Sequence, residues 1–180
     1  IIYTRNRSHL VETDFYSSNK YILDKPKGGG LCAWKPYYIL DTLNRMEPND
    51  ILMYMDSADR IDNGDTLRDN LLNYMSDKHI LITAGAFPNR MYTKRDCFHF
   101  MGCDSSTYWD AIQIEAGILV VKNTDYTKKI MLEWLEYCRV PAIITDDENI
   151  CGKDNFPEFK DIRYDQSVLT NIAISNNIKP

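Results

Sequence analysis

Apolar and polar positions along this chain follow two different periods, and each period predicts a different kind of element. Runs dominated by apolar residues, at Ile51–Met55, His79–Ala84 and Gly117–Val121, predict strands. The continuous apolar run Ile51–Met55 is typical of a strand covered on both faces. Over residues 126–138 the apolar side chains instead recur at helical spacing on one face. That stripe includes Trp134 and indicates a helix packed on the core rather than a ligand site.

Prolines and capping residues place the remaining elements. Pro36 suits the first turn of a helix because its φ is fixed, and Pro48 ends that helix. The stretch from Thr66 resembles a capping box with Asp69 in place of Glu, and it opens another helix. Residues 139–164 are polar and poorly periodic, which is typical of a functional or mobile loop. Shorter patterns predict a strand and two helices, at Ile1–Thr4, about Ser8–Phe15 and about Gln166–Ser175.

The order of these elements predicts the fold class. Strands and helices alternate, which is typical of an α/β domain with three layers and a mostly parallel central sheet. The 180 residues suffice for one domain with a full hydrophobic core, so we expect a single domain over 1–180. The chain begins with Ile1 rather than Met, and we expect the domain to be cut from a longer protein.

Composition limits the kinds of partner and the cellular compartment that we expect. The formal net charge is -5 and no dense Lys/Arg cluster occurs, so nucleic acid is not an expected partner. The five cysteines are odd in number and lack CxxC spacing, which argues against a disulfide framework and a zinc site. Reduced thiols in a compartment such as the cytoplasm are expected instead. No apolar run approaches the roughly 20 residues that span a bilayer, so no transmembrane segment is expected.

Two aspartates beyond the strand Ile51–Met55 are the main candidates for chemistry. In open α/β sheets ligands bind beyond the carboxyl ends of the strands. Asp56 and Asp59 stand at this end, and such a pair can hold Mg²⁺ or Mn²⁺ against substrate phosphates. Alternatively, Asp56 caps a turn and Asp59 is solvated, and this segment alone does not decide between the two. A calcium loop is disfavoured, because the spacing does not match an EF-hand and no suitably placed Glu follows.

Four ordered blocks of sequence resemble a known family. The first is Gly28–Leu40, GGGLCAWKPYYIL, and the second is Asn49–Asp56, NDILMYMD. Downstream follow Gln113–Leu119, QIEAGIL, and Asp165–Leu169, DQSVL. Together they resemble the GT-A-fold glycosyltransferases of bacterial polysaccharide synthesis and of large DNA viruses. The resemblance implies a GT-A-like (Rossmann-like) domain that transfers a sugar from a nucleotide-sugar donor, in particular a UDP-sugar, to a glycan or glycoprotein acceptor.

The resemblance also implies roles for individual residues. Asp56 would lead a DxD-type motif and, with Asp59, hold Mn²⁺ or Mg²⁺ beside the diphosphate. Glu115 would be the reacting carboxylate, as base, as nucleophile or as a ligand of a sugar hydroxyl. Gln113 and Asp165 would complete the catalytic group. The implied donor-binding residues are Arg5, Trp34, Lys35, Asp56, Ser57, Gly117 and Gln166.

Several of these residues have an ordinary alternative role. Trp34 can belong to the core, and Lys35 can be solvated, which is the commoner fate of a lysine. Gly117 can simply begin a strand, and Asp165 is well placed to cap the final helix.

The chain departs from the family pattern at informative positions. Ala58 stands where a strict DxD motif has its second carboxylate, so Asp59 would have to replace it. Tyr164 stands where the family often has His, and residues 31–33 replace aromatic positions beside Trp34. The missing carboxylate motivates a second hypothesis, a non-catalytic module that binds a nucleotide sugar or a carbohydrate. A third hypothesis, a metal-dependent phosphohydrolase, accounts for the aspartates but not for the other blocks.

Overall fold

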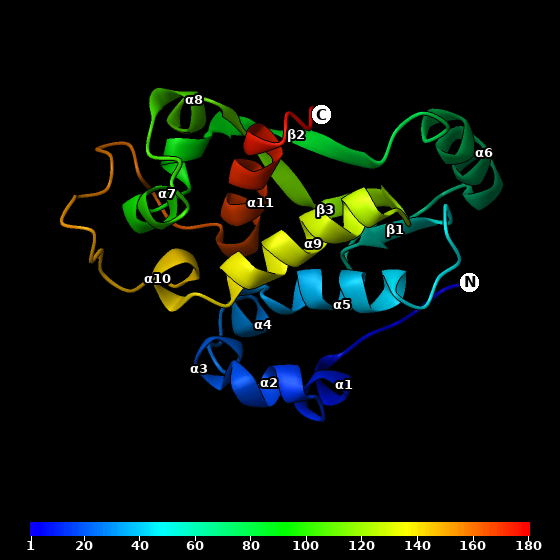
Figure 1. The fold of residues 1–180 in the computed structure, drawn as a ribbon, viewed down its shortest axis with the longest axis horizontal. Coiled ribbons are helices and arrows are strands. Elements are labelled where there is room, and N and C mark those ends of the chain that lie inside the picture. Colours follow the sequence, from blue (N-terminus) through cyan, green and yellow to red (C-terminus); the bar gives the residue numbers. More distant parts are fainter.

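A computed structural model describes all residues of the chain, 1–180, and contains one three-stranded sheet. The strands are β1 (Ile51–Met55), β2 (Ile80–Pro88) and β3 (Ile112–Lys122). Their order is β1-β3-β2, and β3 runs antiparallel to both neighbours (Figure 1). The expected three-layer GT-A-like domain with a mostly parallel central sheet is therefore wrong.

The physical reason lies in the connections between the strands. β1 and β2 point the same way and are linked through α6 (Gly64–Tyr74), but β3 enters between them from the opposite direction. The β2–β3 connection carries only short helices, α7 (Arg95–Phe100) and α8 (Ser106–Trp109), and no long crossover helix. β1 is only half-buried along its whole length, so the expectation that Ile51–Met55 is covered on both faces is wrong. An apolar run also looks the same whichever way its neighbours point, so the sequence pattern does not report strand direction.

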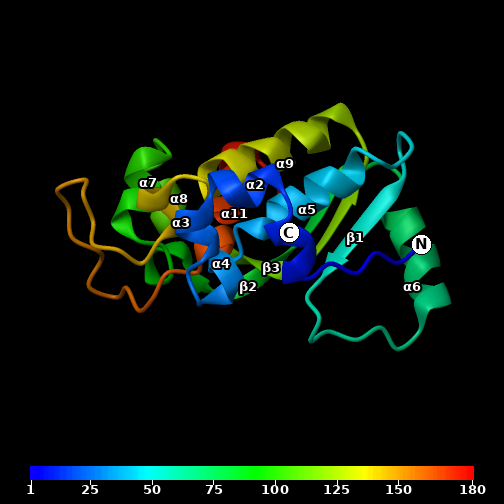
Figure 2. The ribbon, with the colours of Figure 1, turned by 90° about the horizontal axis from the view of Figure 1, so that it is seen from below.

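Three helices form a layer on one face of the sheet (Figure 2): α5 (Trp34–Leu43), α9 (Asp125–Cys138) and α11 (Tyr164–Ser175). α9 contacts both α5 and α11, and α11 also contacts β3. The core lies between these helices and the sheet, and α9 contributes Ile130, Met131 and Trp134 to it, all essentially inaccessible. The predicted apolar stripe is therefore core from Ile130 to Cys138, whereas its first residue, Tyr126, is 39% exposed.

The N-terminal region differs from its prediction. Residues 1–4 have no secondary structure, so the expected strand is absent. The helix expected over Ser8–Phe15 is replaced by two short ones, because the Thr13 side chain accepts the Tyr16 N–H and starts a new helix. Phe15 stacks on Tyr37 of α5 with ring centroids 4.3 Å apart. The helices of this region are α1 (Arg7–Val11), α2 (Asp14–Ser18), α3 (Lys20–Leu23) and α4 (Gly28–Leu31).

Most other predicted elements are confirmed with shifted ends. Pro36 lies in the first turn of α5 as expected, whereas α6 begins at a different cap, Asn63, whose side chain accepts the Thr66 N–H. β3 begins at Ile112, ahead of the predicted start. The polar stretch 139–164 contains one short helix, α10 (Pro141–Ile144), and is otherwise irregular. None of the helices is long and apolar enough to cross a membrane.

Candidate functional site

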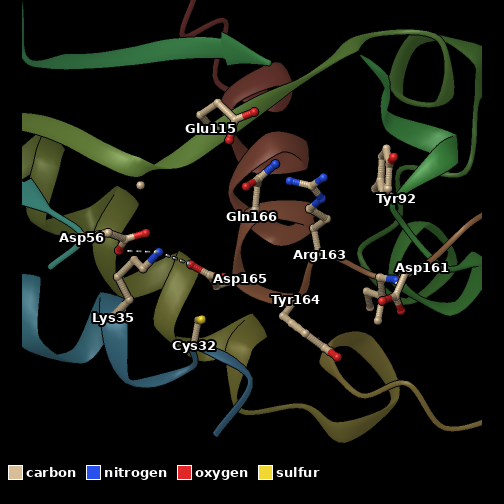
Figure 3. Close-up of a pocket in the computed structure, with 12 residues that line it drawn as sticks. Cys32, Lys35, Asp56, Tyr92, Glu115, Asp161, Arg163, Tyr164, Asp165 and Gln166 are labelled. Atoms are coloured by element: carbon tan, nitrogen blue, oxygen red, sulfur yellow. Dashed lines mark hydrogen bonds and ion pairs between the residues drawn. The ribbon is translucent and has the colours of Figure 1, made fainter. Parts of the chain in front are cut away.

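A cleft of about 450 Å³ lies between the end of β1, the middle of β3 and the start of α11 (Figure 3). Its volume is in the range of small-molecule sites. Part of its lining was singled out by sequence, and these residues come from segments far apart in the chain: Lys35, Asp56, Glu115, Gly117, Asp165 and Gln166. The remaining lining residues are Cys32, Tyr92, Asp161, Ile162, Arg163 and Tyr164.

Lys35 is buried beside the cleft, with 4% of its surface exposed. Its Nζ donates to the Ala116 main-chain oxygen at 2.9 Å and lies 3.1 Å from Asp165 Oδ2 and 3.7 Å from Asp56 Oδ1. Of these three contacts, the one with Ala116 is a hydrogen bond, and the two carboxylates are ion-pair partners. Burial lowers the pKa of Lys35, but the charges of Asp165 and Asp56 outweigh it and the net pKa is raised. Lys35 is therefore not solvated, and its role is to hold two carboxylates together rather than to reach a phosphate.

Asp165 lies in the first turn of α11 and is 4% exposed. It does not cap that helix, because α11 has no side-chain cap bond; its charge instead lies near the positive end of the helix dipole. Burial raises the pKa of Asp165 to about 6, against the lowering effect of Lys35. Trp134 Nε1 donates to the Asp165 main-chain oxygen at 2.8 Å, which anchors the start of α11 to α9.

Asp56 directly follows β1 and is held by local contacts. Its Oδ1 accepts a hydrogen bond from the Tyr54 hydroxyl at 2.5 Å, and its main-chain N–H donates to the Gly117 oxygen at 2.9 Å. Gly117 does not begin a strand but lies inside β3, where the β2–β3 register shifts. A Cβ on Gly117 would stand 3.3 Å from Asp56 Oδ2, so a glycine here leaves room beside that oxygen.

The two predicted metal ligands border one small volume. Asp59 Oδ2 lies 3.9 Å from the same point beside Gly117, and Asp59 is exposed. Asp56 Oδ1 is engaged by Tyr54 and Lys35, which leaves Oδ2 for a ligand. No group of three or more His, Cys, Asp or Glu side chains is arranged around a metal position. Two carboxylates alone do not complete a coordination shell, so a hard cation here would take its other ligands from substrate phosphates and water, as Mg²⁺ usually does.

Glu115 projects from β3 into the cleft above Gln166 (Figure 3). No hydrogen bond or ion pair engages its carboxylate. The other carboxylates of the cleft are all engaged: Asp56 and Asp165 by Lys35, and Asp161 Oδ1 by the Ile162 N–H. Glu115 is thus the cleft carboxylate that is free to accept a proton or bind a hydroxyl.

Gln113, predicted to be catalytic, does not line the main cleft. It is 3% exposed, and its Nε2 lies 3.3 Å from both Asn89 Oδ1 and Thr93 Oγ1. Its Oε1 accepts a hydrogen bond from Gln166 Nε2 at 3.0 Å. Gln113 therefore positions Gln166, whose side chain does reach the cleft.

Three predicted donor-binding residues lie outside the cleft lining. Trp34 packs against the core and donates from Nε1 to the Gly28 oxygen at 3.1 Å, so its ordinary alternative role holds in this structure. Arg5 lies over the Tyr38 ring, 6.0 Å from its centroid. Ser57 is exposed and follows Asp56 without lining the cleft.

The segment Gly28–Cys32, which includes the short element α4, is a left-handed turn. It leads into α5 and sets the position of Lys35. φ is positive at every residue from Gly28 to Cys32, including 105° at Gly30. A Cβ on Gly30 would lie 2.8 Å from the Leu23 Cα and main-chain oxygen, so this position excludes any side chain. The turn brings Cys32 to the cleft, where burial raises the pKa of its thiol to about 12 and keeps it neutral.

Sequence reasoning missed the far end of the cleft. Arg163 lies over the Tyr92 ring, 4.5 Å from its centroid. The Arg163 N–H donates to the Tyr92 oxygen at 2.9 Å, and the Lys160 N–H donates to Met91 at the same distance. Two irregular segments meet here, and neither carries a periodic signal. The only available hint was that Arg163 stands two residues before Asp165.

Comparisons with known proteins found no match: no protein-family model, curated protein or solved structure matches the chain.

Proposed function

We propose that the chain is a glycosyltransferase that moves a sugar from a UDP-sugar to a hydroxyl of a glycan or glycoprotein. The observation that supports this most is convergence on one cleft. Each of the four family-like blocks contributes a charged residue to it: Lys35, Asp56, Glu115 and Asp165. A pocket in which polar and ionisable groups from remote segments meet is the expected form of a reaction site.

The charge of the cleft fits a donor that carries both a diphosphate and a divalent cation. The cleft contains four carboxylates, at Asp56, Glu115, Asp161 and Asp165, against the two cations Lys35 and Arg163. This excess of negative charge would repel a bare diphosphate and attract a cation. Asp56 and Asp59 would hold Mn²⁺ or Mg²⁺, which neutralises the charge on the departing diphosphate. Lys35 and Tyr54 fix the Asp56 carboxylate so that Oδ2 faces that position.

Glu115 acts on the sugar side of the reaction. As the acceptor oxygen bonds to the anomeric carbon, the bond from that carbon to the diphosphate breaks and UDP leaves. The Glu115 carboxylate takes the hydroxyl proton. In a transfer that retains configuration, the same carboxylate would instead attack the anomeric carbon first. Either role needs a carboxylate without a competing partner. The Glu115 carboxylate meets this need, because no hydrogen bond or ion pair engages it.

The test starts with UDP binding by calorimetry, with and without MnCl₂, followed by turnover of a panel of UDP-sugars. Asp56→Asn should abolish the metal-dependent part of binding and turnover, because an amide is a poor ligand for a hard cation. Asp69→Asn, at an exposed position on α6, is the matched control and should retain both. Full metal-dependent turnover in Asp56→Asn would refute the proposal.

The same measurements separate the competing hypotheses. Binding of UDP without turnover of any donor would favour a non-catalytic module, the hypothesis motivated by Ala58. Release of phosphate from simple phosphate esters would favour a phosphohydrolase.

A further inference from the structure

A second cavity of about 50 Å³ adjoins the cleft beside the end of β2. It shares with the cleft the residues Tyr92, Glu115, Arg163 and Gln166. Its other lining residues are Gly85, Ala86, Phe87 and Gln113. In Figure 3 Asp56 and Tyr92 lie on opposite sides of Glu115 and Gln166. The site therefore has two ends, one at the aspartates and one at the edge strand β2, with Glu115 between them.

Two aromatic rings form a wall at the β2 end. The Phe87 and Tyr92 centroids lie 5.5 Å apart with the planes tilted by 57°. Phe87 is 43% exposed, so core packing does not account for it. Its ring presents a flat apolar surface at the mouth of a polar cavity, and such a surface is suited to stacking against C–H groups.

A cation lies over one face of each ring. Lys160 Nζ is 5.7 Å from the Phe87 centroid, and the Arg163 guanidinium is 4.5 Å from the Tyr92 centroid. Both cations are donors only. Acceptors come from the free Glu115 carboxylate and from Gln166, whose amide N–H is already used on Gln113. The ring faces opposite these cations, with donors and acceptors nearby, match a pyranose, which has C–H faces and a rim of hydroxyls.

We propose that Phe87 and Tyr92 form the acceptor subsite, on which a pyranose ring of the glycan acceptor stacks with one hydroxyl directed toward Glu115. This inference rests on the proposed glycosyltransferase function and adds where the acceptor binds and what recognises it. The donor occupies the other end, beside Asp56 and Asp59.

Phe87→Ala tests the subsite, and Phe100→Ala is its matched control. Phe100 is 42% exposed, close to the value for Phe87, and it lies on α7 outside both cavities. The first probe is saturation-transfer NMR with methyl α-D-glucopyranoside, galactopyranoside and mannopyranoside. At least one pyranoside should receive saturation at its C–H protons from the wild type and from Phe100→Ala, with the signal lost in Phe87→Ala.

The second readout separates this inference from the function on which it rests. Hydrolysis of the UDP-sugar by water needs no acceptor, so it reports the proposed function by itself, and it should be unchanged in the control Phe100→Ala. In Phe87→Ala the KM for the saccharide acceptor should rise roughly tenfold, as expected when one stacking contact is lost. An unchanged acceptor KM, or no saturation of any pyranoside by the wild type, overturns the subsite even if donor hydrolysis is intact. Absence of donor binding and hydrolysis in the wild type instead overturns the proposed function, and the subsite with it.

Discussion

Lys35 Nζ lies 3.1 Å from Asp165 Oδ2, and the two side chains are only 5% and 6% exposed. The pair joins α5 to α11 beneath the cleft, and its lysine also approaches Asp56, directly after β1. One ammonium therefore fixes the relative positions of three elements. Stability and site geometry depend on the same ion pair.

Replacing Lys35 by Met should destabilise the protein strongly. The Asp165 carboxylate would remain buried without a counter-charge, and breaking a buried pair in this way typically lowers the free energy of unfolding by roughly 3–5 kcal/mol. Urea unfolding of Lys35→Met measures the loss. Adding Asp165→Asn to it should recover part of the stability, because the uncompensated charge is then removed.

The exposed pair Arg45–Asp41 provides the control for that experiment. Its N–O distance is 2.7 Å, but the arginine side chain is 65% exposed. Breaking this ion pair with Arg45→Met should change the free energy of unfolding by less than about 1 kcal/mol. Equal losses in the two single variants would show that Lys35 contributes no more than a surface lysine.

Stability should fall as pH rises from about 4 to about 6 through the titration of Asp165. Burial raises its folded-state pKa to about 6, whereas an unfolded Asp titrates near about 3.9. In this window the folded protein binds a proton that the unfolded chain has lost, so raising the pH favours unfolding, by at most about 1.4 kcal/mol per pH unit. Urea unfolding at several pH values should show this slope in the wild type relative to Asp165→Asn. Parallel curves for the two proteins would contradict the buried, raised pKa.

Gly30→Ala should destabilise the protein more than Gly29→Ala. Both glycines have positive φ, so each alanine carries a backbone strain of about 1–2 kcal/mol. At Gly30 the new Cβ would also collide with the Leu23 main chain at 2.8 Å, whereas at Gly29 the nearest atom is 3.9 Å away. Thermal unfolding of the two variants compares them. Equal melting temperatures would mean that the close approach of residues 23 and 30 is not maintained in solution.

Glu115→Gln should lower sugar transfer by roughly 100-fold or more while UDP binding with Mn²⁺ is retained. The amide keeps the shape of the side chain but cannot accept a proton or attack carbon, and proton transfer of this kind contributes typically 10²–10⁴-fold. Transfer rates and UDP calorimetry measure the two effects. Glu12→Gln, at an exposed position after α1, should leave both unchanged. A wild-type transfer rate in Glu115→Gln would show that Glu115 takes no part in the reaction.

The sequence predicted several residues that line the cleft, but it did not predict the direction of the strands that hold them. Asp56 and Asp165 were identified because they follow or begin recognisable elements, and the structure places both at the cleft. Strand direction was not readable, because an apolar run such as Ile51–Met55 is the same in a parallel and an antiparallel pair. The roles of Gln113 and Lys35 were also not readable. Burial and bonding partners, which depend on tertiary packing, make them positioning residues.

The β2 end of the site shows a further limit of sequence reasoning. Phe87, Tyr92 and Arg163 meet only because segment 160–163 bonds to residues 91–92. Contacts between two irregular segments leave no period in either one. Residues of this kind are identified from the folded structure and not from the sequence pattern.

The central place of β3 has a consequence for how the site would open. β1 and β2 are edge strands, while β3 pairs with a neighbour on both sides and packs against α11. Main-chain amides of such a strand exchange with solvent hydrogen mainly through global unfolding, whereas edge strands and loops open locally. Val120 and Val121, which have a partner on both sides, should therefore exchange most slowly, whereas Glu115 pairs with β2 alone and Gly117 lies at the register shift. The cleft thus begins where the most protected part of the sheet ends, and local opening there would not require the sheet to unfold.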